Sequence, residues 1–380
     1  MPHQYKCTKR TSEGVCYLMC SMPNVYCKAT AIKQADGSME LRKPHTHEVN
    51  EAEYEMVIAK KLLRDTLIQR AKLETKALRL IYDEEAVNSP NAAVDYTWPT
   101  AESSMRQARK KTLPPLPPTL KELAEYLDLN ENRLQCNNDR FYQEWVVDND
   151  GSYSIIFACR SLIDSVVHQG ANELHADGTF KVVPAVPRCK QLFVMHLILQ
   201  NHSIPVCYVL MESKTEVAYN KVLDRFKAAF PNIRPNKILT DYEIGLQNAL
   251  KTAYPQAQIT GCWFHFVQSL LKKINKLGYS RYVKQNSNAK MCLKMTSVLP
   301  LLPTEQIREG FEQIKTYARN NGALLPRFFT YFSSFWLRDN MLENLSVFNQ
   351  YRRTNNNIES FHSNLKQTFQ VNHPNLWVVL

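Results

Sequence analysis

Three acidic residues from residue 173 onwards in this 380-residue chain have the type and the setting that metal-dependent chemistry requires. Asp177 ends a short apolar segment that predicts a strand, and Asp241 ends a second such segment just before a predicted helix. Glu359 lies in the first turn of a predicted helix that runs to Phe369. Because the carboxyl ends of strands in an α/β sheet converge on one edge, these carboxylates could form one cluster. Cations must neutralise such a cluster, and two Mg²⁺ or Mn²⁺ ions would activate the attacking and leaving oxygens of a phosphodiester.

Each acid also has a simpler interpretation. Asp177 precedes Gly178, and Asp-Gly is a common turn, while an aspartate before a helix, as at Asp241, is a common N-cap. The three acids together, in this order and each on its predicted element, favour a metal site for phosphoryl transfer.

The elements that would position these acids are strands and helices that follow one another from Glu173 onwards. Mostly helical sequence then extends to residue 358, and residues 119–170 are also predicted to be mostly helical. This order predicts an α/β fold with a mixed sheet. The predicted strands are 174–176, 191–199, 204–211, 237–240 and 258–263, and the predicted helices between them are 216–230 and 243–254.

Five ordered motifs make residues 173–370 resemble the transposase domain of mutator-like elements, the MULE family. The resemblance implies an RNase H-like fold with a helical insertion before the last catalytic helix. It also implies that Asp177, Asp241 and Glu359 form a catalytic triad that holds Mg²⁺ or Mn²⁺. The motifs are Asp177–Phe180, Lys214–Glu216 with Tyr219, Leu239–Asp241, Cys262–His265, and Asn355–Asn356 with Glu359–Ser360.

Cys262 and His265 form a C-x-x-H pair beside the last predicted strand, and the MULE family carries the same pair. Two ligands do not complete a zinc site, and the nearby sequence offers no clear second pair. The pair therefore belongs to a structural or second metal site, or it is a buried cysteine beside a hydrogen-bonded histidine.

The first 50 residues contain another group of metal-ligand types. Cys7, Cys27, His45 and His47 would give Zn²⁺ two sulfur and two nitrogen ligands. In an extended His-x-His segment both imidazoles lie on the same side. Because so short a segment has few large apolar residues for a core, we expect short strands and turns held by a metal ion.

Cys16 and Cys20 lie between the two predicted cysteine ligands and are alternatives to them. Tyr5–Cys7, Cys27–Ala29 and Pro44–His47 resemble the second half of a FLYWCH-type zinc finger. The resemblance implies a small zinc-stabilised β module that lacks the family's opening positions.

Composition divides the remaining chain. Gly and Pro are absent from residues 51–89, and apolar residues recur there at helical spacing, which predicts helices. Residues 113–118 are Leu-Pro-Pro-Leu-Pro-Pro, a composition that predicts a stiff, extended linker. The chain ends on an apolar segment, so we expect helices that follow Glu359 in the family to be missing. The expected parts are a finger over 1–50, a helical spacer over 51–112, the linker over 113–118, an N-terminal transposase region over 119–170, and the RNase H-like domain over 171–380.

The net charge of +11, from 47 Lys and Arg against 36 Asp and Glu, favours a polyanionic partner such as DNA.

The ten glycines are well separated, which excludes Walker, GxGxxG and GxSxG loops. No apolar run is long enough to cross a bilayer, and the polar, basic N-terminus does not resemble a secretory signal. We therefore expect a nuclear protein with no membrane partner, whose cysteines are thiols or metal ligands.

Residues 244–304 contain no acidic side chain. A surface of one sign beside a carboxylate site suits the phosphate backbone of DNA, although a solvated helical face is the simpler alternative. The predicted DNA-binding residues are Lys272, Lys273, Lys276, Arg281, Lys284, Lys290 and Lys294.

These features predict a DNA transposase, or a protein derived from one, that acts in DNA transposition and recombination by metal-dependent cleavage and strand transfer. Its partners would be DNA and a second copy of the chain in a homo-oligomer. One alternative is a domesticated, non-catalytic DNA-binding protein or transcriptional regulator, against which the intact triad argues. Another is a different RNase H-like nuclease, which would share the metal chemistry.

Overall fold

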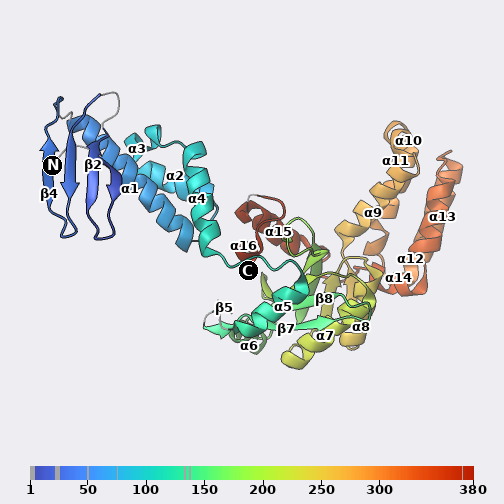
Figure 1. Ribbon diagram of the computed structural model, residues 1–380. Helices are drawn as coiled ribbons and strands as arrows, with labels where there is room; N and C mark the ends of the chain where they lie inside the picture. Colours follow the sequence, from blue (N-terminus) through green and yellow to red (C-terminus); the bar gives the residue numbers. More distant parts are fainter. Residues whose placement is uncertain are drawn as a thin grey trace. The chain divides into compact units, whose positions relative to one another are not determined.

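A computed structural model describes residues 5–21, 26–48, 51–74, 76–131, 134–136, 138–369 and 371–380 (Figure 1). The chain divides into two compact units, Met1–Pro114 and Pro115–Leu380. Within the described ranges, every helix is too short or too polar to cross a lipid bilayer.

The first unit begins with a small antiparallel sheet in the strand order β1-β2-β3-β4. The turn before β4 contains Gly37 at φ +86°, and the carboxylate of Asp36 accepts hydrogen bonds from the backbone and the hydroxyl of Ser38. In the described part of this sheet, only small side chains are buried, so its apolar core is slight. The strands are β1 Tyr5–Arg10, β2 Cys16–Cys20, β3 Thr30–Lys33 and β4 Met39–Lys43.

Four helices complete the first unit around a core of their own. Leu63, Leu67 and Ile81 are buried in it, as their helical spacing in the sequence indicates. The guanidinium of Arg109 donates hydrogen bonds to the carbonyls of Ala71, Glu74 and Lys76 and so fixes the last helix to the end of the first one. The helices are α1 Glu51–Leu73, α2 Leu78–Asn88, α3 Pro90–Asp95 and α4 Trp98–Thr112.

The second unit is built on a seven-stranded mixed sheet in the order β13-β12-β9-β10-β11-β8-β7. Strand β12 runs parallel to both of its neighbours, and the other pairs are antiparallel. Two short strands, β5 Gln135–Cys136 and β6 Asp139–Arg140, pair with each other outside it. The seven strands are β7 Tyr142–Val147, β8 Tyr153–Ala158, β9 Glu173–Thr179, β10 Gln191–Leu199, β11 His202–Met211, β12 Lys237–Thr240 and β13 Gln258–Gly261.

Helices α6 Arg160–His168, α7 Glu216–Ala229 and α8 Ile244–Ala253 share a hydrophobic core with this sheet. Phe193 of β10, Tyr219 of α7 and Leu250 of α8 are fully buried in it. This core holds β9 and β12 side by side, which sets the positions of the residues at their ends.

The helices between β13 and residue 346 form a lobe with a second core, rich in aromatic rings (Figure 1). Phe266, Phe311, Phe332 and Trp336 are fully buried there. The prediction of a helical region before Glu359 agrees with these elements. They are α9 Trp263–Lys276, α10 Ser280–Gln285, α11 Ser287–Val298, the 3-10 helix η2 Leu299–Leu301, α12 Thr304–Asn320, α13 Pro326–Phe335 and α14 Asp339–Leu345, followed by α15 Asn356–Phe369 and α16 Leu376–Val379.

The secondary structure differs from the predictions in three places. Residues 119–170 are not mostly helical: between α5 Leu120–Leu129 and α6 lies the hairpin β7–β8, in which Asp148 accepts backbone hydrogen bonds in a turn closed by Gly151 at φ +78°. Pairing with β11 draws the apolar run of β8 into the main sheet. In addition, β9 extends to Thr179, so Asp177 lies within the strand, and β13 ends at Gly261 because α9 begins two residues later.

Candidate active site

Asp177 and Asp241 lie on neighbouring parallel strands at the same end of the sheet. The register places Thr240 of β12 opposite Ala176 of β9, so Asp241, the next residue, is level with Asp177. The backbone N–H of Gly178 donates to Asp177 Oδ1 at 2.8 Å, and that of Glu243 donates to Asp241 Oδ1 at 3.1 Å. Both carboxylates are therefore held by the backbone that follows them.

Glu359 approaches this pair from helix α15, which packs against β9. Burial raises the pKa of Asp177 most, and the negative charges of Asp241 and Glu359 raise it further. The N–H of Gly178 and the ammonium of Lys214 oppose these effects, and the pKa is about 7. Asp241 and Glu359 thus both lie close enough to act on the buried Asp177, and a cation would relieve this repulsion.

His362 is a neighbour of the acids that the sequence analysis missed. It follows Glu359 by one helical turn, and its Nδ1 lies 3.8 Å from Asp177 Oδ2. Burial lowers the pKa of His362 to about 4, so the imidazole is neutral near pH 7. The i, i+3 spacing from Glu359 could have identified it, because such residues share a helix face.

A polar network lies beside the acids. Gln191 Nε2 donates to the hydroxyl of Tyr219 at 2.7 Å, and that hydroxyl donates to Glu243 Oε1 at 3.0 Å. Lys214 Nζ lies 3.4 Å from Glu243 Oε2 and 4.2 Å from the centroid of the Phe180 ring. The network places one ammonium group near Asp177, where it could meet a phosphate.

The segment before α15 is hydrogen-bonded to Cys262, which precedes α9, and to Ala176 of β9. The backbone N–H of Asn355 donates to Cys262 Sγ at 3.2 Å, and its side-chain amide donates to the carbonyl of Ala176 at 3.5 Å. Asn355 is fully buried. These contacts explain how a residue so distant in sequence as Glu359 reaches the end of β9.

Cys262 and His265 also lie close to Glu359. Cys262 precedes the first residue of α9, His265 lies in its first turn, and His265 Nε2 is 3.5 Å from Glu359 Oε1. One potential ligand atom from each of the three residues lies within 4.8 Å of the other two. The tertiary structure thus adds a third donor to the C-x-x-H pair.

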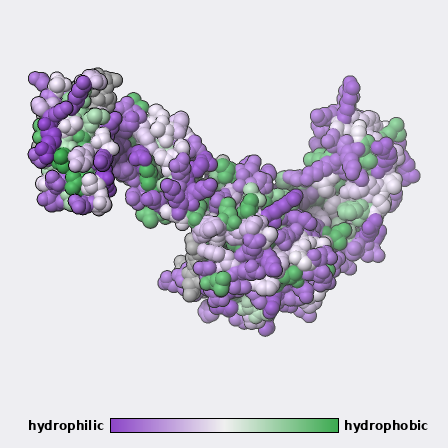
Figure 2. Space-filling view, in the orientation of Figure 1, coloured by the Kyte–Doolittle hydropathy of each residue, from purple (hydrophilic) through white to green (hydrophobic). Residues whose placement is uncertain are grey.

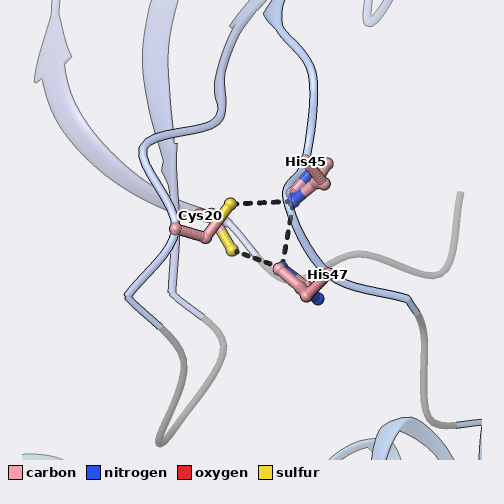
Figure 3. A group of neighbouring side chains, drawn as sticks. Cys20, His45 and His47 are labelled. Atoms are coloured by element: carbon pink, nitrogen blue, oxygen red, sulfur yellow. Dashed lines mark hydrogen bonds between the residues drawn. The ribbon is translucent and has the colours of Figure 1, made fainter.

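The N-terminal sheet brings together Cys20, Cys27, His45 and His47. Figure 3 shows Cys20, His45 and His47 pointing toward one another. Cys20 Sγ lies 3.4 Å from His47 Nε2, Cys27 Sγ lies 3.6 Å from His45 Nδ1, and the two ring nitrogens are 3.2 Å apart. These separations match two sulfur and two nitrogen ligands around one tetrahedral Zn²⁺, which would be about 3.3–3.6 Å apart.

Cys20 occupies the place that the sequence analysis assigned to Cys7. In the β1–β2 register Cys20 lies opposite Tyr5, whereas Cys7 lies opposite Leu18, two positions further along the strand. The Cys7 thiol is exposed and donates to the carbonyl of Lys9. Cys20, an alternative in the sequence analysis, is thus a member of the group.

Contacts around His45 and Cys27 favour the binding of a metal ion by this cluster. The Tyr5 hydroxyl lies 2.7 Å from His45 Nε2 and so orients His45 Nδ1 toward the cysteines, as hydrogen-bond partners of zinc-binding histidines do. Although burial raises the pKa of the Cys27 thiol, hydrogen bonds from Thr46 and Ala29 lower it to about 7. A thiolate, the form that binds zinc, is therefore accessible near neutral pH.

The predicted DNA-binding residues lie on three successive helices of the helical lobe, which Figure 2 shows to be hydrophilic over much of the visible face. All but the half-buried Lys273 are exposed, and Lys273 Nζ lies 4.2 Å from the centroid of the Tyr331 ring. None of them forms an ion pair with a described residue. They are Lys272, Lys273 and Lys276 on α9, Arg281 and Lys284 on α10, and Lys290 and Lys294 on α11.

Comparison with known proteins identifies one part of the chain. Residues 174–269 match the family model described as the MULE transposase domain. This range contains Asp177, Asp241, Cys262 and His265, while Glu359 lies beyond it. A search of the curated proteins found no match. The family match supports a transposase, or a transposase-derived protein, as the class of this chain.

Proposed function

We propose that the protein is a DNA transposase, or descends from an active one, with Asp177, Asp241 and Glu359 as its catalytic acids. The proposal is supported chiefly by the register that sets Asp241 level with Asp177, and by the negative charges of Asp241 and Glu359, which both act on Asp177. Carboxylate oxygens are the donors that Mg²⁺ and Mn²⁺ prefer. When bound, two such ions would activate the attacking oxygen and stabilise the leaving oxygen of a phosphodiester.

The chain's own residues would position these groups. Asp177 and Asp241 are fixed by backbone N–H donors, and Glu359 is held by the anchored segment before α15. Lys214 would bind a phosphate oxygen of the DNA near the acids, because its ammonium already acts on the charge of Asp177.

An RNase H-like fold is part of this proposal. The antiparallel strands β9, β10 and β11, followed by the parallel strands β12 and β13 with helices between them, support it. The lobe from α9 to α14 would be the helical insertion that precedes the glutamate in the MULE family. The boundaries 1–50, 51–112, 113–118, 119–170 and 171–380 belong to the same proposal.

The remaining parts would serve DNA binding. Cys20, Cys27, His45 and His47 would hold Zn²⁺ in a FLYWCH-type finger, which their mutual spacing supports. The basic residues of α9, α10 and α11 would contact the phosphate backbone. Transposition and recombination would take place in the nucleus, with a homo-oligomer joining two DNA ends.

The proposal is tested by incubating supercoiled plasmid with the purified chain and Mg²⁺ or Mn²⁺. Wild type is expected to nick the plasmid or to join a 3′-hydroxyl oligonucleotide to it. Asp177→Asn, Asp241→Asn and Glu359→Gln should each reduce the rate at least about 100-fold. Asp164→Asn, at an exposed position on α6, is the matched control and should keep the wild-type rate.

A chain that retards DNA in a gel without cutting it would support the alternative, a non-catalytic DNA-binding protein or regulator. Metal-dependent nicking without strand transfer would support a different RNase H-like nuclease. Nicking that survives all three substitutions would show that these acids are not the catalytic ones.

A further inference from the structure

The fold brings a third potential metal ligand, Glu359, close to Cys262 and His265. Cys262 is the N-cap residue of α9, and His265, three residues later, lies on the same side of its first turn. Glu359 comes from the first turn of α15, and ligand atoms of the three residues lie within 4.8 Å of one another. We propose that Cys262, His265 and Glu359 form a binding site for Zn²⁺ that shares Glu359 with the catalytic acids.

The spacing of the donors fits a common ion better than a direct contact. His265 Nε2 and Glu359 Oε1 are 3.5 Å apart, too far for a strong hydrogen bond. Nitrogen and oxygen ligands of one tetrahedral Zn²⁺ would be about 3.3–3.4 Å apart. The present separation therefore needs little change to admit the ion.

Two buried atoms of this group have unused bonding capacity. Glu359 Oε1 and His265 Nδ1 are both buried, and neither has a hydrogen-bond partner among the described residues. Leaving a buried carboxylate oxygen unsatisfied is unfavourable unless a donor or a cation meets it. A metal ion would satisfy the carboxylate.

Cys262 would contribute a sulfur ligand to the same Zn²⁺. Cys262 is fully buried, and its Sγ accepts the backbone N–H of Asn355 at 3.2 Å at the N-terminus of α9. Burial raises the pKa of the Cys262 thiol, so Zn²⁺ would displace the thiol proton on binding. The fold thus supplies one sulfur, one imidazole and one carboxylate ligand, which leaves a fourth position open.

The donor set separates this site from the one for Mg²⁺. Thiolate and imidazole ligands select Zn²⁺, whereas Mg²⁺ requires oxygen ligands. Because Glu359 would serve both sites, Zn²⁺ bound by Cys262 and His265 would withdraw Glu359 from Asp177 and Asp241. Zinc would then inhibit the magnesium-dependent reaction. This consequence rests on the proposed function, but the zinc site itself does not.

The site is tested on the full chain by equilibrium dialysis against Zn²⁺ after chelation, with bound zinc counted per chain. Cys262→Ser should bind about one zinc fewer than wild type, because serine keeps the N-cap but removes the soft ligand. Cys292→Ser, which removes a buried thiol from α11, is the control and should bind as much as wild type. A cobalt titration of the double variant Cys20→Ser with Cys27→Ser, whose N-terminal cluster has lost both thiols, should still show a cobalt–thiolate absorption band.

Equal zinc content in wild type and Cys262→Ser, together with no cobalt–thiolate band in the Cys20→Ser, Cys27→Ser double variant, would overturn the proposal. If Cys262→Ser fails to fold by circular dichroism, His265→Gln decides the question by the same count. None of these measurements needs DNA, so the site can hold while the proposed function fails. Where nicking is observed, zinc should inhibit wild type at about tenfold lower concentration than it inhibits Cys262→Ser.

Discussion

Arg352 Nη1 lies 2.9 Å from Glu173 Oε2, and this ion pair joins the segment before Glu359 to the start of the strand that carries Asp177. The two side chains are only 17% and 18% exposed. The other oxygen of Glu173 lies 2.8 Å from His175 Nε2, so both of its oxygens have partners. The pair therefore fixes the position of α15 relative to β9.

Replacing Arg352 should loosen this connection. Arg352→Ala leaves Glu173 mostly buried without its cation, and we expect the free energy of unfolding to fall by roughly 2–4 kcal/mol in urea titrations. Arg353→Ala is the matched control, because Arg353 is exposed and its side chain, among the described residues, bonds within its own loop to the carbonyl of Gln350. Equal losses in the two variants would show that the ion pair does not anchor the segment.

The raised pKa of Asp177 makes the metal-free protein sensitive to pH. The pKa is about 7 in the fold against an ordinary value of 3.8, so the native state holds a proton that the unfolded chain releases. The contribution of Asp177 to stability is present below about pH 3.8 and is lost as the pH rises to about 7. Between pH 5 and pH 7 the free energy of unfolding should fall by at most about 1.4 kcal/mol per pH unit through this group.

Asp177→Asn should remove this part of the pH dependence, and Asp164→Asn should not. Saturating Mg²⁺ should also remove it, because the ion binds the deprotonated carboxylate. A pH profile that is the same in wild type and Asp177→Asn, measured by urea unfolding with a chelator present, would contradict the assignment.

The N-terminal cluster predicts different effects for two cysteines on neighbouring strands. Cys20→Ser should lose zinc and lower the thermal stability of the finger, while Cys7→Ser should retain both, because Cys7 lies outside the group. Zinc content and thermal unfolding, each with and without a chelator, measure the difference. If Cys7→Ser loses zinc and Cys20→Ser keeps it, the zinc ligand is Cys7, as the sequence predicts, and not Cys20.

Gly261 allows β13 to pass close to Tyr242, the residue after Asp241. A Cβ atom at Gly261 would overlap the Tyr242 ring, which packs edge-on against Trp336 at 4.7 Å between centroids. Gly261→Ala should therefore cost about 3 kcal/mol of unfolding free energy.

Gly310→Ala is the control for this substitution. Its Cβ would meet only the terminal methyl groups of Leu302 and Leu299, and alanine gains up to about 1 kcal/mol of helix propensity. We expect a change near zero in the same urea titration. A small effect at Gly261 as well would show that Tyr242 can move.

The basic helices of the lobe predict salt-dependent DNA binding. Lys276→Glu combined with Lys284→Glu should weaken binding about tenfold or more and reduce the slope of log affinity against log salt. Lys221→Glu, at an exposed position on α7, makes the same kind of charge change outside this surface and should have little effect. Fluorescence anisotropy with a labelled duplex at several salt concentrations distinguishes the two variants.

Local patterns predicted much of the second unit. The strands β10 and β12 have the predicted bounds, because continuous apolar runs end at polar or turn residues there. The prediction failed over residues 119–170, where β7 and β8 are stabilised by pairing with each other and with β11. Such pairing depends on strands distant in the sequence and leaves a weak local signal.

The sequence by itself determined which residues could do chemistry, because residue type and short-range spacing are local properties: two aspartates at the ends of apolar segments, a glutamate in a first helical turn, and a C-x-x-H pair. The tertiary structure alone decided which of them meet. The β1–β2 register selected Cys20 over Cys7, and the anchoring of α15 brought Glu359 and His362 to Asp177 and brought Glu359 to His265. Strand register and helix docking follow from contacts between distant segments, which no single stretch of sequence contains.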